Sequence, residues 1–431
     1  MTQLQAAQAG QITEAMRQVA HDENLPAERV REAVAAGHAV IPLNPAHRGA
    51  RPIGVGRMFR TKVNANLGRS PTQSEQGGEL AKLAVALQAG ADFVMDLSVG
   101  PELGVIRRGM LDASPVPLGT VPVYETLARA ADDLPVLDVD LLLKVIREQA
   151  EQGVDFMTLH AGLLRAHIPL ALTRIMGIVS RGGAIMAEWM QQHRAENPLY
   201  TRWDEVLEIL VEHDVTVSLG DGLRPGCLAD ASDAAQFGEL DVLGDLVRRT
   251  RARGVQVMVE GPGHVPFDQI QENMERQQRI CDGAPFYVLG PIVTDIGAGY
   301  DHLVAAIGAT AATVHGASLL CYVTPAEHLG LPDAEEVHQG LMAFRIAAHA
   351  GDVARGLPGA RDADDAMSRA RVAFDWNRQF ELALDGPRAR ARWERTRASS
   401  DQAHTDDHCS MCGKTFCAVR TSKRIREGSA D

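Results

Sequence analysis

Residues 215–226 read VTVSLGDGLRPG, and residues 255–264 read VQVMVEGPGH. Each segment begins with a short apolar, β-branched run, which is typical of a buried strand, and ends in glycines and polar residues. Between them, residues 240–254 (LDVLGDLVRRTRARG) carry apolar side chains at the spacing of an amphipathic helix. A strand, a polar turn, a helix and a second strand form a βα unit, which predicts parallel strands covered by helices.

The same alternation continues in both directions along the chain. Nine such runs occur between about residue 60 and residue 325, with helical segments between them, and their spacing is that of a βα unit. This number favours an α/β fold of the (β/α)8 TIM-like barrel type over an open sheet, and one run is expected to be a loop or a strand leading into the barrel. The other runs are TKVNANLG, DFVMDLS, VPLGTVPVY, VDFMTLHAG, GIVSRGG, PFYVLGPIVTD and SLLCYVTP.

The segments outside the barrel differ in composition. Near the N-terminus, Thr13 and Pro26 are plausible helix start signals, and AVIPLN (39–44) is expected to form a short strand. After residue 333 the pattern becomes helical, and it gives way to a polar, acidic stretch. The expected divisions are an N-terminal helical segment (1–50), a catalytic barrel (51–332), a C-terminal helical region (333–400) and a flexible tail (401–431).

Composition excludes several classes of protein. The chain has 431 residues, 45% of them hydrophobic, and a net charge of −13, so binding to nucleic acid or to an anionic membrane is not expected. No apolar stretch is long enough for a transmembrane helix, and the polar N-terminus lacks the apolar core of a signal peptide. We therefore expect a cytoplasmic protein, in which six cysteines do not form a disulfide framework.

Polar residues follow almost every predicted strand, and in a barrel these positions gather at one mouth. Two glycine-rich turns, SRGG (180–183) and DGLRPG (221–226), each contain an arginine and are suited to binding an anion. Glu260 could act as a general base or bind an amine. His264 and His328 could bind zinc or iron, although His302 and His315 are alternatives and each histidine could equally be structural.

Three cysteines lie close together in the tail, in the sequence CSMCGKTFC (409–417). The C-x2-C-x4-C spacing predicts a metal site. Zinc would need a fourth ligand, for which His404 or His408 is available, whereas a [4Fe–4S] cluster would keep one iron open for another ligand. The spacing alone leaves both possibilities open.

Longer stretches give the chain a resemblance to a known family. They include TKVNANLG, DFMTLHAG, SLGDGLRPG, VQVMVEGPGHVP, APFYVLGPIVTDI, LCYVTPAEHLGLP and the tail motif CSMCGKTFC. Together they resemble the phosphomethylpyrimidine synthase (ThiC) family in its short form, from about residue 10 to the end. The resemblance implies a barrel homodimer that converts 5-aminoimidazole ribonucleotide into 4-amino-5-hydroxymethyl-2-methylpyrimidine phosphate for thiamine biosynthesis. It also implies a [4Fe–4S] cluster, S-adenosyl-L-methionine, a divalent metal and a reducing electron donor.

The resemblance also assigns roles to individual residues. It implies that Cys409, Cys412 and Cys417 hold the iron–sulfur cluster and that His264 and His328 bind the divalent metal, zinc or iron. Glu260 and Asp221 are the expected catalytic residues. The expected substrate contacts are Asn66, Met95, Tyr124, His160, Ser180, Arg181, Gly182, Asp221, Gly222, Leu223, Arg224, Glu260 and Tyr287.

Two alternatives remain. The chain has GAGYDH (297–302) and PLNPAH (42–47) where the family pattern differs slightly, and a paralogous group, 5-hydroxybenzimidazole synthase, uses the same substrate for anaerobic cobamide biosynthesis. The other alternative is a barrel protein without radical chemistry whose tail holds a structural zinc. The reaction product and the metal content of the tail distinguish these hypotheses.

Overall fold

A computed structural model describes the chain except for residues 70–75, 101, 131–136, 399–407, 409–410 and 429–431. The chain divides into two compact units, Met1–Leu357 and Pro358–Asp431. The first unit contains all of the described strands, and the second is helical. Since the two units are separate compact bodies, each is described by itself.

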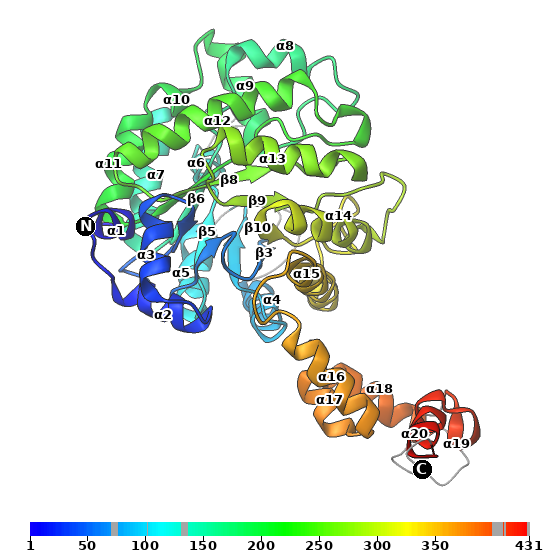
Figure 1. Cartoon of the computed structure of the whole chain (residues 1–431). Coiled ribbons are helices and arrows are strands. Elements are labelled where there is room, and N and C mark those ends of the chain that lie inside the picture. The colour runs from blue at the N-terminus through cyan, green and yellow to red at the C-terminus, as the bar shows by residue number, and fades with distance from the viewer. Residues whose placement is uncertain (70–75, 101, 131–136, 399–407, 409–410, 429–431) are drawn as a thin grey trace. The chain divides into compact units, whose positions relative to one another are not determined.

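Eight parallel strands of the first unit form a closed barrel (Figure 1). Neighbouring strands pair in sequence order, and β10 closes the barrel by pairing with β3, with Leu320 opposite Val63. Most strand residues are buried because side chains inside the barrel and beneath the covering helices both avoid water. The strands are β3 (Lys62–Leu67), β4 (Phe93–Asp96), β5 (Leu118–Thr120), β6 (Phe156–Leu159), β7 (Thr216–Leu219), β8 (Val257–Gly261), β9 (Phe286–Leu289) and β10 (Ala317–Cys321).

Helices follow each barrel strand and cover the outside of the barrel (Figure 1). Among the residues that the structure describes, no helix is both long and apolar enough to cross a membrane. The covering helices are α4 (Gln76–Gln88), α5 (Leu103–Ala113), α6 (Pro122–Arg129), α7 (Val139–Gln152), α8 (Ile168–Ala171), α9 (Arg181–His193), α10 (Pro198–Thr201), α11 (Trp203–His213), α12 (Ala234–Ala252), α13 (Ile270–Ile280), α14 (Asp301–His315) and α15 (Ala334–Ala354), with short 3-10 turns at Arg165–His167, Leu228–Asp230 and Phe267–Gln269.

The N-terminal segment has its own small hydrophobic core, in which Met16, Val30 and Phe59 are fully buried. It consists of α1 (Gln3–Gln8), α2 (Glu14–Asp22) and α3 (Ala27–Ala35), followed by β1 (Ala39–Val40) and β2 (Val55–Gly56), which pair antiparallel. Thr13 caps α2 through its side chain, and Pro26 precedes α3, so the predicted helix starts are confirmed. The predicted strand at 39–44 is confirmed only for its first two residues.

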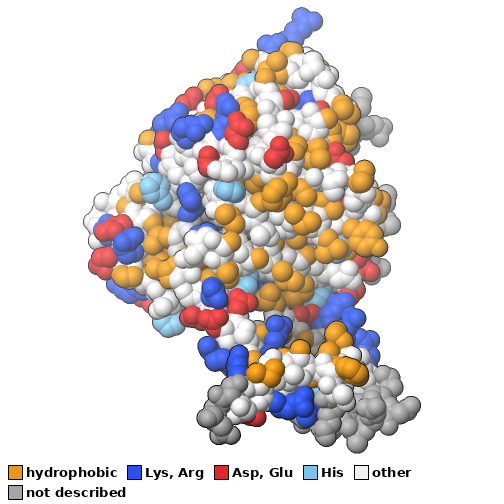
Figure 2. Space-filling model, turned by 45° about the vertical axis from the view of Figure 1, so that its right-hand side comes forward, with side chains coloured by type: hydrophobic (Ala, Val, Ile, Leu, Met, Phe, Trp, Pro, Cys, Tyr) orange, Lys and Arg blue, Asp and Glu red, His pale blue; other side chains and the backbone are white. Residues whose placement is uncertain are grey.

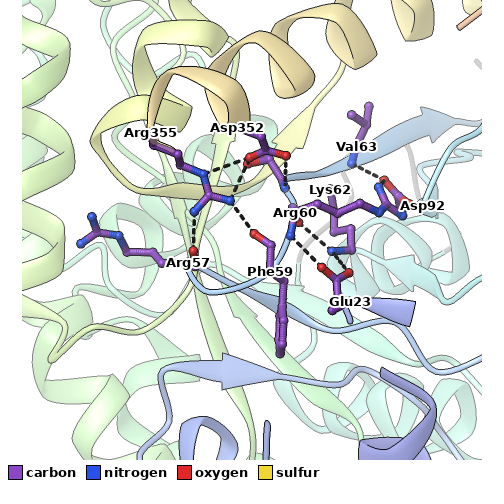
Figure 3. A network of polar contacts seen from close by, with 10 residues as sticks. Glu23, Arg57, Phe59, Arg60, Lys62, Val63, Asp92, Asp352 and Arg355 are labelled. Carbon is purple, nitrogen blue, oxygen red and sulfur yellow. Dashed lines mark hydrogen bonds and ion pairs between the residues drawn. The ribbon is translucent and has the colours of Figure 1, made fainter. Parts of the chain in front are cut away.

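A network of charges joins this segment to the amino-terminal ends of the barrel strands (Figure 3). Asp92 accepts from the backbone N–H of Val63 at 2.9 Å and pairs with the guanidinium of Arg60. Lys62 is 1% exposed and pairs with Glu23 at 2.7 Å. Burial alone would raise the pKa of Asp92, but the pairing with Arg60 and the nearby Lys62 lowers it.

The last barrel helix is bound to the same end of the barrel. Asp352 near the end of α15 accepts from both the backbone N–H of Thr61, at 2.9 Å, and its hydroxyl, at 2.7 Å. Arg355 donates to Asp352 at 2.8 Å and to the backbone carbonyl groups of Arg57 and Phe59 (Figure 3). The amino-terminal end of the barrel is therefore held to both chain segments that flank it.

Two features differ from the pattern expected from the sequence. The predicted run GIVSRGG is the loop and the first turn of α9 rather than a strand, because Ser180 caps the helix by accepting from the N–H of Gly183 at 3.2 Å. This run is the one in excess of eight. The helix α15 packs on α14, α4 and β3, so the structure places it in the barrel unit, which ends at Leu357.

The second unit is built around aromatic side chains. Trp376 and Phe380 pack against Trp393, with ring centroids 5.4 and 5.6 Å from it. Lys423 lies over the ring of Phe374 at 5.7 Å, which links the last helix to the first helix of this unit. The helices are α16 (Asp362–Ala373), α17 (Trp376–Leu382), α18 (Gly386–Ala398), α19 (Gly413–Phe416) and α20 (Ala418–Gly428).

Candidate active site

A cavity of about 480 Å³ opens at the carboxyl ends of the barrel strands. Its wall combines apolar side chains with a few carboxyl, amide, imidazole and guanidinium groups, which is typical of a small-molecule site. The wall residues are Asn66, Met95, Leu97, Val121, Tyr124, Thr158, His160, Asp221, Arg224, Glu260, Gly261, Tyr287, Leu289 and Cys321.

One side of the cavity is a chain of hydrogen bonds among β3, β9 and β10. Asn64 donates to the hydroxyl of Tyr287 at 2.7 Å and to the side-chain oxygen of Asn66 at 2.8 Å. Asn66 in turn contacts the sulfur of Cys321 at 3.0 Å. The Tyr287 hydroxyl lies 3.6 Å from the sulfur of Met95. These contacts fix the side chain of Asn66, so its amide is held in one orientation toward a ligand.

Two carboxyl groups face the cavity from β8 and from the loop after β7. Glu260 accepts from the hydroxyls of Thr158 at 2.6 Å and Ser218 at 2.9 Å, while Asp221 lies 3.2 Å from a guanidinium nitrogen of Arg224. Burial raises the pKa of Asp221 to about 7. The charge of Arg224 acts in the opposite direction, and the charge of Glu260 adds to the rise. Burial also raises the pKa of Glu260. Asp221 can therefore hold or release a proton near neutral pH.

His160 lies at the end of β6 and is 3% exposed. A side chain at Gly182 could not be accommodated, because its Cβ would lie 2.3 Å from the imidazole ring. Burial, together with the positive charge of Arg224, lowers the pKa of His160 to about 3. The imidazole is therefore neutral, and its Nδ1 has no hydrogen-bond partner among the described residues.

The two predicted glycine-rich turns lie beside the cavity, behind the side chains that form its wall. Ser180 caps α9, and Arg181 stacks over the ring of Tyr124 at 5.0 Å from its centroid. Leu223 is fully buried, and Gly222 lies in the same turn as Asp221. The predicted set thus falls into two groups. Asn66, Met95, Tyr124, His160, Asp221, Arg224, Glu260 and Tyr287 line the cavity, whereas Ser180, Arg181, Gly182, Gly222 and Leu223 do not.

Several wall residues were not predicted from the sequence. Cys321 is the last residue of β10, so the rule that strand ends form the mouth could have identified it. Thr158 lies inside β6 rather than at its end, and its only sequence signal is a polar residue within an apolar run. Leu97, Val121, Gly261 and Leu289 carry no chemical signal and contribute shape to the wall.

The two histidines predicted to bind metal lie together. His264 follows β8 and His328 follows β10, and their ring centroids are 5.3 Å apart. His264 Nδ1 contacts Asp295 at 2.8 Å, and His328 Nδ1 lies 3.4 Å from Asp301. Carboxylates at Nδ1 are the usual outer partners of metal-binding histidines, which then bind through Nε2. Within the described ranges, no group of three or more His, Cys, Asp or Glu side chains is arranged to hold a metal ion.

The predicted cluster ligands are only partly within the described residues. Cys409 lies outside them. Cys412 immediately precedes α19 and is half-buried, and Cys417 immediately precedes α20 and is buried. Neither forms a disulfide bond. Thiols that flank a short helix and are not oxidised to a disulfide are suited to binding metal.

Buried carboxyl groups, an arginine and a neutral histidine around a cavity at the mouth of a (β/α)8 barrel define an enzyme of the TIM-barrel class. The chain matches the Radical SAM ThiC family over residues 2–424, and it belongs to this family.

Its relatives are similar over almost their whole length. A phosphomethylpyrimidine synthase of Halobacterium salinarum is 59% identical over 100% of this chain and 90% of the relative. That of Natronomonas pharaonis is 60% identical over 99% and 89%, and that of Haloarcula marismortui is 56% identical over 99% and 88%. Among solved structures, a dihydropteroate synthase of Stenotrophomonas maltophilia with active site-bound imidazole has a TM-score of 0.43 at 13% identity, over 71% of this chain and 96% of that one. The last likeness is too distant to inform function.

Proposed function

We propose that the protein converts 5-aminoimidazole ribonucleotide into 4-amino-5-hydroxymethyl-2-methylpyrimidine phosphate in thiamine biosynthesis, by radical chemistry with S-adenosyl-L-methionine. The observation that carries the proposal is the full-length similarity to relatives named phosphomethylpyrimidine synthase within the Radical SAM ThiC family. The cavity supports it, because an apolar wall with a few polar groups is typical of a small-molecule site.

The cavity groups match the parts of this substrate. Arg224, whose side chain lines the cavity, would attract the phosphate, since a guanidinium group binds anions. Asn66 and the neutral His160 can hydrogen-bond the imidazole and ribose. Glu260 and Asp221 are the proposed catalytic residues. The Asp221 oxygen Oδ2, which has no hydrogen-bond partner among the described residues, can carry a proton for transfer.

The tail would supply the radical chemistry. Cys409, Cys412 and Cys417 would hold a [4Fe–4S] cluster, and the thiols of Cys412 and Cys417 are available for it because neither is in a disulfide. Held by these residues, the cluster would supply the one-electron reduction of S-adenosyl-L-methionine, with the electron coming from an external donor.

A divalent metal would bind between His264 and His328. The two rings are close enough to share an ion, and each has a carboxylate at Nδ1 that orients the ring. Imidazole nitrogens suit zinc or iron. Because the described residues offer no third protein ligand in this arrangement, the remaining positions would be filled by water or by groups of the bound ligands.

The identity of the reaction product tests the proposed function. Anaerobically reconstituted protein is mixed with 5-aminoimidazole ribonucleotide, S-adenosyl-L-methionine and a strong reductant, and the products are identified by mass spectrometry. Hydroxymethylpyrimidine phosphate with 5'-deoxyadenosine is the expected result. Hydroxybenzimidazole would instead assign the chain to cobamide biosynthesis. One zinc retained on the tail, without iron, sulfide or 5'-deoxyadenosine, would favour a barrel protein with a structural zinc.

A variant of the tail gives the matched control for this assay. Cys412→Ala removes one proposed cluster ligand from the helical unit, outside the barrel unit with its own core. We expect this variant to lose turnover and 5'-deoxyadenosine formation completely while keeping the thermal unfolding transition of the wild type. Turnover by a Cys412→Ala protein would contradict the assignment of the cluster to the tail.

We also propose that the protein is a homodimer through the outer face of α14 and α15. Leu303 and Ile307 on α14 are 51% and 56% exposed, and Ile346 on the adjacent α15 is 57% exposed. Figure 2, which brings this side of the barrel forward, shows hydrophobic side chains gathered over it. A second copy is the proposed occupant, because a two-fold dimer needs one self-complementary apolar patch and a pair of packed helices provides it.

Oligomeric state tests the dimer. Ile307→Glu would place a charge in the proposed interface and should convert a dimer into a monomer, as measured by light scattering after gel filtration. Val105→Glu is the matched control, because Val105 is 57% exposed on α5. If Ile307→Glu stays dimeric, this face is not the interface.

A further inference from the structure

A third buried carboxyl group lies immediately behind the cavity. Glu239 projects from α12, is 2% exposed, and lines a second cavity of about 340 Å³ that shares Asp221, Arg224 and Glu260 with the first. No strand-end rule identifies it, because it lies on a covering helix. The sequence motifs that indicate the site do not include it.

The contacts of Glu239 are to the backbone of the DGLR turn. Its Oε2 accepts from the N–H of Leu223 at 2.7 Å, and the N–H of Gly222 also contributes to its stabilisation. The other oxygen, Oε1, has no hydrogen-bond partner among the described residues. A buried carboxyl group that accepts from the backbone N–H of a turn helps to fix the conformation of that turn.

The same turn is held from the opposite side. The backbone carbonyl of Gly222 lies so close to α9 that a Cβ at Gly183 would be 2.1 Å from its oxygen. On the other side of the turn, a Cβ at Gly222 would lie 2.9 Å from Glu239 Oε1, which leaves no space for a side chain there. The turn is therefore packed tightly between the amino-terminal end of α9 and Glu239. Because Asp221 and Arg224 belong to this turn, a shift of Glu239 would shift them as well.

We propose that Glu239 is a positioning residue that holds the Asp221–Arg224 turn against α9 and thereby sets the affinity of the site for its phosphate-bearing substrate. This inference rests on the proposed function. Glu239 acts through the turn, because Asp221 and Arg224, rather than Glu239, line the main cavity. It joins the two glycine-rich turns into one anion-binding unit.

Substrate binding should depend on pH through Glu239. Burial, and next the charge of Asp221, raises the pKa of Glu239 to about 8, whereas Arg174 acts in the opposite direction. Arg224 and Glu260 also face the shared cavity. At pH 7 Glu239 is therefore protonated and neutral. Above about pH 8 it ionises beside Asp221, and repulsion between the two carboxylates should loosen the turn and weaken substrate binding.

Direct binding of 5-aminoimidazole ribonucleotide to the full-length protein, measured by calorimetry at pH 7 and pH 9, tests the inference without requiring catalysis. Glu239→Leu removes the hydrogen bonds and should weaken binding about tenfold or more, since a buried backbone N–H loses its partner. Glu239→Gln keeps an acceptor oxygen and cannot ionise. It should bind as tightly as wild type at pH 7 and should lack the loss of affinity that we expect for wild type at pH 9.

Leu240→Ala is the matched control, since Leu240 lines the same second cavity but makes no hydrogen bond to the turn. If Leu240→Ala weakens binding as much as Glu239→Leu, packing accounts for the effect and the inference is overturned. Equal pH dependence in wild type and Glu239→Gln also overturns it. If the wild type does not bind the ribonucleotide at all, the proposed function fails together with the inference, whereas wild-type binding with unchanged variants overturns the inference alone.

Discussion

Each end of the barrel holds a cluster of buried charged residues, and the pKa values in the two clusters are shifted in opposite directions. At the amino-terminal end, Asp92 is paired with Arg60, beside Lys62, and its pKa is lowered. At the carboxyl-terminal end, Asp221 and Glu260 are buried with raised pKa values, and Arg224 is the cation that both face. A carboxylate that is paired with a cation holds chain segments together. A buried carboxyl group whose nearby positive charge does not offset the cost of burial can still exchange a proton.

The difference has an energetic consequence. A buried carboxylate with a matched cation contributes to holding its neighbours, and removal of one partner leaves the other charge uncompensated. A buried carboxyl group without enough positive charge destabilises the native state as it ionises. We therefore expect substitutions at the amino-terminal end to change stability, and substitutions at the mouth to change activity.

Substitution of Glu260 should give the largest effect on activity. Glu260→Gln keeps an oxygen that can accept from Thr158 and Ser218, but it cannot act as a base. Turnover should fall by about 10²–10⁴-fold, the usual contribution of a general acid or base. The free energy of unfolding in urea should stay close to that of wild type. A Glu260→Gln protein that unfolds much more easily would show that the mouth also holds the fold together.

Substitution of Asp92 should have the opposite pattern. Asp92→Asn would leave the half-exposed Arg60 and the buried Lys62 without the nearby Asp92 carboxylate, and the expected destabilisation is about 1.5–3 kcal/mol, the usual worth of a hydrogen bond to a charged group. Turnover per folded molecule should not change, because Asp92 lies at the other end of the strands from the cavity. Urea unfolding followed by circular dichroism measures the first quantity, and the product assay measures the second. Loss of turnover in fully folded Asp92→Asn would remove the contrast between the two ends.

The pH dependence of stability should also differ between the two ends, because the pKa of Glu239 is raised and that of Asp92 is lowered. The pKa of Glu239 is raised to about 8, so between about pH 5 and pH 8 the native state keeps a proton that the unfolded state has released. Stability should therefore fall as pH rises from 6 to 8, by roughly 1–3 kcal/mol for one such group. Asp92, whose pKa is lowered, acts in the acid range, where stability is lost as pH falls through that lowered pKa.

The Glu239→Gln variant isolates this effect. Because its side chain does not titrate, its urea midpoint should vary less between pH 6 and pH 8 than that of wild type. The comparison is made on the two proteins side by side at each pH. An identical pH dependence in both would assign the raised pKa to another group at the mouth.

Much of the barrel and its mouth could be predicted from the sequence, because strand runs and strand ends are local patterns. The run GIVSRGG (177–183) does not form a strand, because Ser180 caps the helix α9 there, and helix capping outweighs the apolar content of the run. Glu239 could not be predicted, since its role depends on a contact to Leu223 across 16 residues of sequence and through the packing of α12. Thr158 was missed for a related reason, because its partner Glu260 comes from β8, two strands away in the barrel.

The smallest expected effect concerns a carboxylate at the mouth, Asp295, that contacts a neighbouring side chain rather than a ligand. Asp295 contacts His264 Nδ1 at 2.8 Å and orients the ring, as the amino-terminal network orients its own partners. Asp295→Asn should weaken binding of zinc by about 10–100-fold, the usual cost of losing an outer partner of a metal-binding histidine. Competition with a chelator measures the zinc affinity, and His264→Ala gives the reference for loss of the ligand itself. Because Asp295 is partly exposed, the unfolding transition should not move. If zinc affinity is unchanged while stability falls, Asp295 is a structural residue of the same kind as Asp92.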